Sequence, residues 1–188
     1  MHALGVFLLF LQVALVLLAA SYLYYDWKLG AASVPSSPAA GRAVAELVPP
    51  EASCVVDLGS GWGGMAIKVA RARPQTKVIG IEYALPPYAF SRLRQLFNPS
   101  LKNLSFLRTD LFKYPLAPVS AVICYMPPEM MERLAPKLAG ELRPGAIIIS
   151  NSAGLPGQTP EKTVDVPALL LAEKIFIYRI GHDQTHRL

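Results

Sequence analysis

Residues 55–64 read VVDLGSGWGG, and this stretch decides the fold. Its short apolar start, with two β-branched valines, is typical of a buried strand. The glycines that follow permit a sharp turn and let a ligand approach the backbone closely. A helix that begins at the last glycines presents free N–H groups in its first turn. The stretch therefore predicts a strand, a ligand-binding turn and a helix in succession.

The same alternation extends along the chain. We expect strands at 54–58, 77–83, 104–107, 121–126 and 146–150, and helices at 38–48, 63–73, 88–97 and 128–142. Near-continuous apolar strands that alternate with helices indicate a parallel sheet covered on both faces. The tail differs, because 161–166 and 174–180 both read as strands and the roughly seven residues between them are too few for a helical crossover. The predicted fold is α/β, a Rossmann-like and mostly parallel sheet with a C-terminal antiparallel hairpin at its edge.

The N-terminal segment has a different character. Residues 4–25, LGVFLLFLQVALVLLAASYLYY, contain no charged side chain. As a helix the segment would be about 33 Å long, enough for a bilayer core. A cleaved signal peptide is the alternative, but no Lys or Arg precedes the run and it is longer than the usual apolar region of such a peptide. Lys28 and Arg42 follow it, so we expect a single-pass transmembrane helix with the domain on the cytoplasmic or an equivalent side.

The expected organisation has three parts. Residues 1–28 form the N-terminal membrane anchor, residues 29–50 a linker and a first helix, and residues 51–188 the main domain. Ser37 is placed as the N-cap of the first helix and Pro38 in its first turn.

Composition excludes some functions and leaves others unsupported. The net charge is +5, but no dense run of Lys and Arg occurs, so nucleic-acid binding is not expected. A basic domain beside an anionic membrane explains the charge equally well. Cys54 and Cys124 lack the spacing of a zinc site, so we expect no metal and interpret both as buried free thiols.

The glycine-rich turn matches two kinds of cofactor site. Gly59, Gly61 and Gly64 fit the G-x-G-x-x-G pattern of dinucleotide binders. Asp57, however, lies two residues before the first glycine and would repel a pyrophosphate. Its carboxylate can instead interact with a cationic group, such as the ammonium of S-adenosyl-L-methionine (SAM). The turn therefore favours a ligand with a positive end.

Acidic residues follow the next two strands. Glu82, at the end of the second strand, can accept hydrogen bonds from both ribose hydroxyls, as it would in either an NAD or a SAM site. Asp110, after the third strand, can accept from the adenine amino group, with Leu111 or Phe112 against the ring. A solvated strand-end charge for Glu82 and a turn cap for Asp110 are the alternatives. Together with Asp57, they converge on one edge of the sheet.

Tyr125 lies near the end of the fourth predicted strand, a position that faces the methyl donor in a methyl-transfer enzyme. Its ring and hydroxyl can position an amine, and the alternative is a core tyrosine. Methyl transfer to a neutral amine depends largely on alignment. Tyr125 is therefore our candidate for substrate positioning.

These residues resemble a known group. VVDLGSGWGG, GIEY, the Asp110 position and the edge hairpin are similar to class I, or seven-strand, SAM-dependent methyltransferases. VPSSPAAGRAVAEL, IEYALPPYAFSR, CYMPPEMMERLAPKL and ISNSAGLPGQTPEKTVDV, with the apolar N-terminal helix, resemble the small membrane-anchored protein-lysine methyltransferases. That group includes enzymes that modify the mitochondrial adenine nucleotide carrier or the c-ring protein of the ATP synthase, and prokaryotic relatives.

The resemblance implies roles for individual positions. The residues it places at the cofactor are Asp57, Gly59, Ser60, Gly61, Glu82, Tyr83, Asp110 and Leu111, with Pro35 and Ser36 in a segment folded over the methionine end. Trp62 departs from the pattern, since those enzymes usually carry an acidic residue after the second glycine.

We predict a SAM-dependent methyltransferase that N-methylates a lysine of a membrane-associated protein. One alternative is methylation of a small lipophilic molecule. Two others belong to different classes: a nicotinamide-dependent oxidoreductase and a non-catalytic SAM-binding module.

Overall fold

The structure is a computed structural model and describes residues 2–29, 36–167 and 173–181. Its elements in chain order are α1 (His2–Leu29), α2 (Pro38–Leu47), β1 (Cys54–Leu58), α3 (Gly64–Ala72), β2 (Lys77–Glu82), α4 (Leu85–Leu96), β3 (Leu104–Arg108), β4 (Ala121–Tyr125), α5 (Pro128–Glu141), β5 (Ile147–Asn151), β6 (Lys162–Val166) and β7 (Glu173–Arg179). Every predicted strand and helix is present, most within two residues of the predicted bounds.

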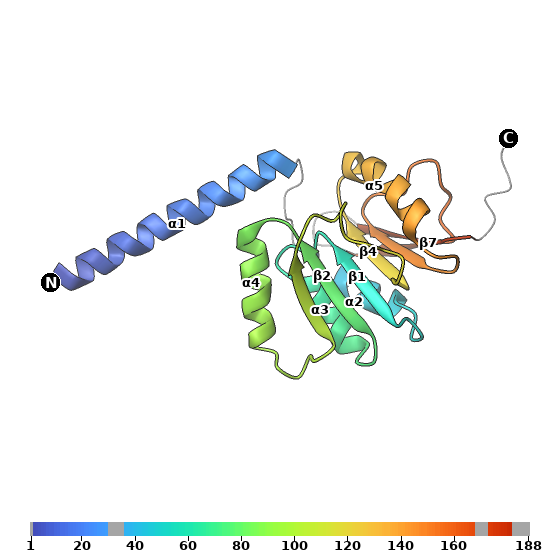
Figure 1. Cartoon of the computed structure of the whole chain (residues 1–188), viewed down its shortest axis with the longest axis horizontal. Coiled ribbons are helices and arrows are strands. Elements are labelled where there is room, and N and C mark those ends of the chain that lie inside the picture. The colour runs from blue at the N-terminus through green and yellow to red at the C-terminus, as the bar shows by residue number, and fades with distance from the viewer. Residues whose placement is uncertain (1, 30–35, 168–172, 182–188) are drawn as a thin grey trace.

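One seven-stranded sheet forms the centre of the domain, in the order β3-β2-β1-β4-β5-β7-β6 (Figure 1). The five strands from β1 to β5 are parallel to one another. β7 runs antiparallel to both β5 and β6, which confirms the predicted hairpin at the edge. The carboxyl ends of β1, β2, β3, β4 and β5 therefore meet at one edge of the sheet, where open α/β folds bind their ligands.

Helices cover both faces of the sheet, as predicted (Figure 1). α2, α3 and α4 lie on one face, where the buried core includes Val44, Val69 and Phe106. α5 lies on the other, over a core that includes Leu134 and Ile148. α2 packs with the residues that follow it, because it contributes buried side chains to the first core: Ala40, Val44 and Ala45.

Helix α2 begins as its sequence predicts. The Ser37 hydroxyl oxygen accepts a hydrogen bond of 3.0 Å from the Ala40 N–H, and Pro38 occupies the first turn. A capping side chain here satisfies one of the N–H groups that a helix start leaves open. The bond fixes the start of α2.

The start of one helix differs from prediction. α4 starts three residues earlier than expected, because Pro86 and Pro87 lie inside its first turn. Proline is tolerated there, since the N–H groups of a first turn make no hydrogen bond within the helix. The connection from β3 to β4, for which no helix or strand was predicted, is a series of turns, and buried Leu116 and Val119 attach it to the core.

Helix α1 forms where the apolar segment predicts a helix and extends away from the domain (Figure 1). Its described large apolar side chains, such as Phe7 and Phe10, are exposed. Across the part of the chain that the structure describes, no helix is both long and apolar enough to cross a membrane. The predicted transmembrane helix is therefore not supported.

Candidate functional site

The turn after β1 is shaped by glycines in the left-handed region. Gly59 has φ of +69° and Gly63 has φ of +78°, a conformation that side-chain-bearing residues rarely adopt. The Ser60 N–H donates to the Ile81 carbonyl at 2.8 Å, and the Gly63 N–H donates to the Ser60 carbonyl at 2.9 Å. The turn is therefore attached to β2 and leads directly into α3.

Asp57 lies in β1 just before this turn and is only 3% exposed. Its Oδ2 atom has no hydrogen-bond partner among the described residues. Burial raises the pKa of this carboxyl to about 7, the Ala66 backbone N–H lowers it, and the nearby Glu82 carboxylate raises it. A buried acid with an unpaired oxygen is unfavourable on its own. It fits a site that receives a cationic group.

Glu82 connects the turn to the end of β2. Its Oε2 accepts from the Gly61 N–H at 2.9 Å, and its Oε1 accepts from the Ala84 N–H at 2.7 Å. Burial raises the pKa of this carboxyl, while the backbone donors lower it. Each oxygen keeps a second lone pair, so ribose hydroxyls can still be accepted. The sequence did not predict that Glu82 also holds the glycine turn.

The other predicted cofactor residues lie at or near this edge. Ser60 is buried, and its hydroxyl lies against Gly80 rather than at the surface. Tyr83 is exposed directly after Glu82. Asp110 Oδ1 accepts from the Phe112 N–H at 2.9 Å, which is the turn-capping role that we kept as its alternative. Cofactor contacts of all three residues stay predictions.

Leu111 and Ser36 are half-buried, and Leu111 packs against the core on the α5 side. Pro35 lies outside the described residues. Their predicted roles at the adenine and at the methionine end stay predictions.

A polar pair beside Tyr125 was missed by the sequence analysis. Tyr125 ends β4 and is paired in register with Asn151, the last residue of β5. Asn151 is completely buried; its Nδ2 donates to Glu173 Oε2 at 2.7 Å. Its Oδ1 has no partner within the described ranges. The available signal was a polar residue at the end of an apolar strand, one position beyond the predicted strand end.

These polar residues share one face of the sheet. Side chains alternate along a strand, and Val55, Ile123 and Ile149 pack in the core beneath α2 and α3. Asp57, Tyr125 and Asn151 each lie two positions further along β1, β4 and β5 and therefore face the same way. Three adjacent strands thus present a carboxylate, a phenol and an unpaired amide oxygen on one face. Tyr125 lies opposite Asn151, and Asp57 lies opposite Ile123, two positions earlier along β4.

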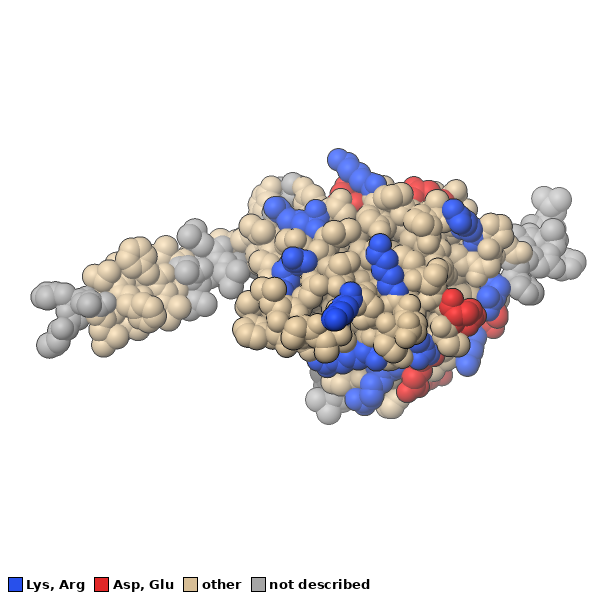
Figure 2. All heavy atoms as spheres, turned by 60° about the horizontal axis from the view of Figure 1, so that its bottom comes forward, with Lys and Arg blue, Asp and Glu red and all other residues tan. Residues whose placement is uncertain are grey.

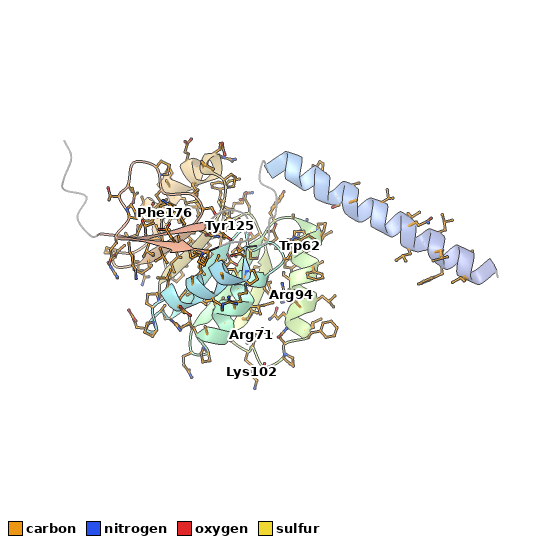
Figure 3. The ribbon with its side chains drawn as sticks, turned by 180° about the vertical axis from the view of Figure 1, so that it is seen from behind. Trp62, Arg71, Arg94, Lys102, Tyr125 and Phe176 are labelled. Carbon is orange, nitrogen blue, oxygen red and sulfur yellow. The ribbon has the colours of Figure 1, made fainter. Side chains whose placement is uncertain are left out.

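Trp62 connects the turn to α4. Its ring meets that of Phe90 edge to face, with centroids 5.4 Å apart, and Arg94 Nη1 donates to the Trp62 carbonyl at 2.8 Å. Figure 3 shows Trp62 and Tyr125 toward the same end of the domain. The residue that departs from the family pattern thus packs on a neighbouring helix.

The described residues contain no group of three or more His, Cys, Asp or Glu side chains that could hold a metal ion. Cys124 is buried and Cys54 half-buried, and both are free thiols.

Comparison with known proteins decides the family. The family model of the ANTKMT methyltransferase domain matches residues 57–162, more than half of the 188-residue chain. This chain belongs to that family. The match begins at Asp57 and includes Glu82, Tyr125 and Asn151. A nicotinamide-dependent oxidoreductase is thereby set aside.

Curated relatives cover much of the same region. A protein-lysine N-methyltransferase of Saccharolobus islandicus (strain REY15A) is 26% identical over 132 residues, which cover 68% of this chain and 79% of that protein. A Rattus norvegicus lysine N-methyltransferase, named for the c subunit of the ATP synthase, is 33% identical over 111 residues, 58% of this chain and 50% of the relative. The chain thus matches about half the length of the rat enzyme.

A solved structure shows the same fold. The RNA methyltransferase from Salinibacter ruber in complex with S-adenosyl-L-homocysteine superposes with a TM-score of 0.73 at 24% identity, over 82% of this chain and 99% of that one. The methyltransferase family and fold identify SAM as the cofactor. The buried Asp57 oxygen and the Glu82 carboxylate, on neighbouring strands, fit its cationic and ribose ends.

Proposed function

We propose that this chain is a SAM-dependent protein-lysine N-methyltransferase acting on a membrane-associated protein. The observation that carries the proposal is the set of polar groups on one face of β1, β4 and β5, which includes the buried Asp57 carboxylate. The lysine substrate draws support from the two relatives, whose names describe lysine N-methyltransferases.

The cofactor side would be held by three features. Asp57 would face the ammonium, Glu82 the ribose hydroxyls, and the glycine turn would let the ligand approach the backbone. Bound SAM supplies an electrophilic methyl group on a sulfonium, which a neutral amine can take in one displacement. These residues bind and orient; the chemistry demands no nucleophile from the chain.

The acceptor side would lie next to Tyr125 and Asn151. The Tyr125 hydroxyl can accept a hydrogen bond from a lysine amine, and its ring can contact the cationic form. The Asn151 Oδ1 atom, which is buried in this structure, can accept a second hydrogen bond where the amine enters far enough to reach it. Glu173 orients the Asn151 amide through the 2.7 Å bond to Nδ2, which leaves Oδ1 for the substrate.

The test uses radiolabelled SAM and a membrane extract. Wild type is expected to label a protein band, and hydrolysis of that band should release N-methylated lysine. Glu82→Ala should abolish the label, whereas Asp165→Ala, an exposed acid on β6, should not. Label that appears in no protein band beyond the Glu82→Ala background would refute protein methylation.

Two other outcomes point to the remaining alternatives. Label that partitions into the organic phase would indicate a small lipophilic substrate. SAM binding without turnover on any substrate would indicate a non-catalytic binding module.

Attachment to a membrane through α1, with the catalytic domain on the cytoplasmic or an equivalent side, stays a sequence-based proposal. Exposed apolar side chains along α1 are compatible with it. Fractionation of cells and alkaline extraction of the membranes test it: recovery of the full chain in the soluble fraction would refute it. Protease protection of sealed vesicles then reports the side.

A further inference from the structure

Helix α4 presents an unusual surface. Its inner side is packed against the domain through buried Pro86, Pro87 and Ser91. Its outer side, continued by one residue beyond the helix, exposes large apolar side chains, which we call the α4 surface: Leu85, Phe90, Leu93, Leu96 and Phe97. Leu96 is 72% and Phe97 78% exposed. Three- and four-residue spacing places Leu85, Leu93 and Leu96 on one side of the helix.

The part of the chain that contains this surface carries charge of mostly one sign. Residues 58–109 contain eight Lys and Arg and a single acid, the buried Glu82; the basic residues are Lys68, Arg71, Arg73, Lys77, Arg92, Arg94, Lys102 and Arg108. This stretch thus accounts for all of the chain's net positive charge. On the face that Figure 2 shows, Lys and Arg are spread over the domain, and the few Asp and Glu lie mostly on the side away from α1.

The cations are close enough to influence one another. Burial lowers the pKa of Lys68, repulsion by Arg42 and Arg94 lowers it further, and the Glu173 carboxylate raises it. Burial likewise lowers the pKa of Arg94, and Arg71 adds to the effect. Figure 3 shows Arg94, Arg71 and Lys102 one after another along this side of the domain. An anionic partner would relieve this repulsion.

Apolar side chains between cations match the interface of an anionic bilayer. An amphipathic helix lying in that interface buries its apolar side chains about 5–10 Å deep, while basic residues meet the phosphates. Nucleic acid would engage the cations but leave the three exposed leucines of the α4 surface in water. One end of α1 approaches α4 (Figure 1), and large apolar side chains of α1 are exposed as well.

We propose that the α4 surface docks onto a bilayer containing anionic lipids, with its apolar side chains in the headgroup region and the flanking Lys and Arg on lipid phosphates. This contact is separate from any attachment through α1 and does not depend on the proposed reaction. Through Phe90 and Arg94, which contact Trp62, it would place the cofactor turn close to the lipid surface.

A site-specific fluorophore on the full chain tests the docking. An environment-sensitive label is attached at Phe97→Cys, with Lys162→Cys on the opposite edge strand β6 as control. Both carry Cys54→Ser, since Cys54 is half-buried and Cys124 buried. Equimolar phosphatidylcholine and phosphatidylglycerol vesicles should shift the emission at position 97 to shorter wavelength. Phosphatidylcholine alone, high salt or the label at 162 should give no such shift.

Charge reversal supplies a second readout. Arg92→Glu should weaken anionic-vesicle binding at position 97 by at least about fivefold, since each basic residue near the surface contributes about that factor. Lys162→Glu, the same change on β6, should not. Co-sedimentation without a shift at position 97 would mean that only α1 binds lipid. An equal emission shift with neutral vesicles would refute the role of the Lys and Arg side chains in docking. A shift with polyglutamate and no vesicles would indicate that the partner is an acidic protein and would refute the bilayer.

Discussion

At the scale of single residues, Asp57 is a buried and poorly solvated carboxyl group beside the glycine turn. The ligand-free protein carries a carboxyl group that is 3% exposed and has one oxygen without a partner among the described residues. Such a group destabilises the fold and is retained where a ligand uses it. The ammonium of SAM would provide the missing partner. Asp57 should therefore strengthen SAM binding while it lowers the stability of the protein without SAM.

Replacement of Asp57 by its neutral amide separates these two effects. Asp57→Asn should weaken SAM binding by about tenfold to a hundredfold, the usual size of a lost charged hydrogen bond. The same change should raise the melting temperature of the ligand-free protein above pH 7. Calorimetric titration and thermal unfolding measure the two quantities. Asp165→Asn, an exposed acid on β6, is the control and should change neither.

The ionisation of Asp57 should also be detectable in the pH dependence of the free energy of unfolding. The pKa of Asp57 is about 7 in the folded protein against an ordinary value of 3.8. Between these values the folded state binds more protons than the unfolded state, so the Asp57 contribution lowers stability as pH rises through this window. The total difference should reach about 4 kcal/mol above pH 7. Urea unfolding of wild type and Asp57→Asn across this pH range measures the difference between their free energies of unfolding. A difference that does not change with pH would contradict the prediction.

Substitutions at Tyr125 and Asn151 should slow the reaction with the lysine substrate and leave SAM binding unchanged. Tyr125→Phe removes only the hydroxyl, and Asn151→Ala removes the unpaired amide oxygen. We expect each to lower kcat/KM for the protein substrate by about tenfold, since one hydrogen bond is lost, with SAM affinity within about twofold of wild type. Steady-state kinetics and SAM titration check this. Weaker SAM binding with unchanged turnover would assign these residues to the cofactor.

At the scale of elements, β2 and β3 pack too closely for any side chain at Gly80. Gly80 is paired in register with Phe106, and an added Cβ would lie 2.4 Å from the buried Phe106 ring and 2.8 Å from the Ser60 hydroxyl oxygen. The sequence shows this glycine only as part of an apolar strand. The ring beneath it comes from a strand 26 positions further along the chain.

Gly80→Ala should therefore destabilise the domain by about 1–3 kcal/mol, the usual range for overpacking a core. It should also weaken SAM binding, because the Ser60 turn must move. Gly140→Ala in α5 is the matched control: nothing lies within 4 Å of its added Cβ. That change should stabilise the protein by up to about 1 kcal/mol through helix propensity. Urea unfolding compares the two; equal midpoints would contradict the packing argument.

At the scale of the whole molecule, the domain and α1 depend little on each other. Among the described residues, one buried core begins at α2 and the other at β1, and neither contains a side chain from α1. The positive charge is likewise concentrated in the half of the domain built from α3, β2, α4 and β3. A catalytic unit with one basic, partly apolar side can fold by itself and still bind a surface.

Deletion of residues 1–29 should leave this unit folded. We expect a melting temperature within a few degrees of the full chain and unchanged SAM affinity, because no core contact is lost. Vesicle binding should weaken without disappearing, since the α4 surface remains. Thermal unfolding, SAM titration and flotation on anionic vesicles check the three statements. Aggregation or loss of SAM binding in the shortened chain would show that α1 is part of the fold.

The sequence alone determined the order of strands and helices, the edge hairpin, and the meeting of Asp57, Glu82 and Tyr125 at one edge. These features follow from the period of apolar residues and from glycine and proline positions, which act on near neighbours along the chain. Tertiary structure decided the raised pKa of Asp57, the second role of Glu82, the Asn151–Glu173 pair and the place of Trp62. Each of these depends on groups brought together from distant positions, so burial and partners, rather than local pattern, set their chemistry.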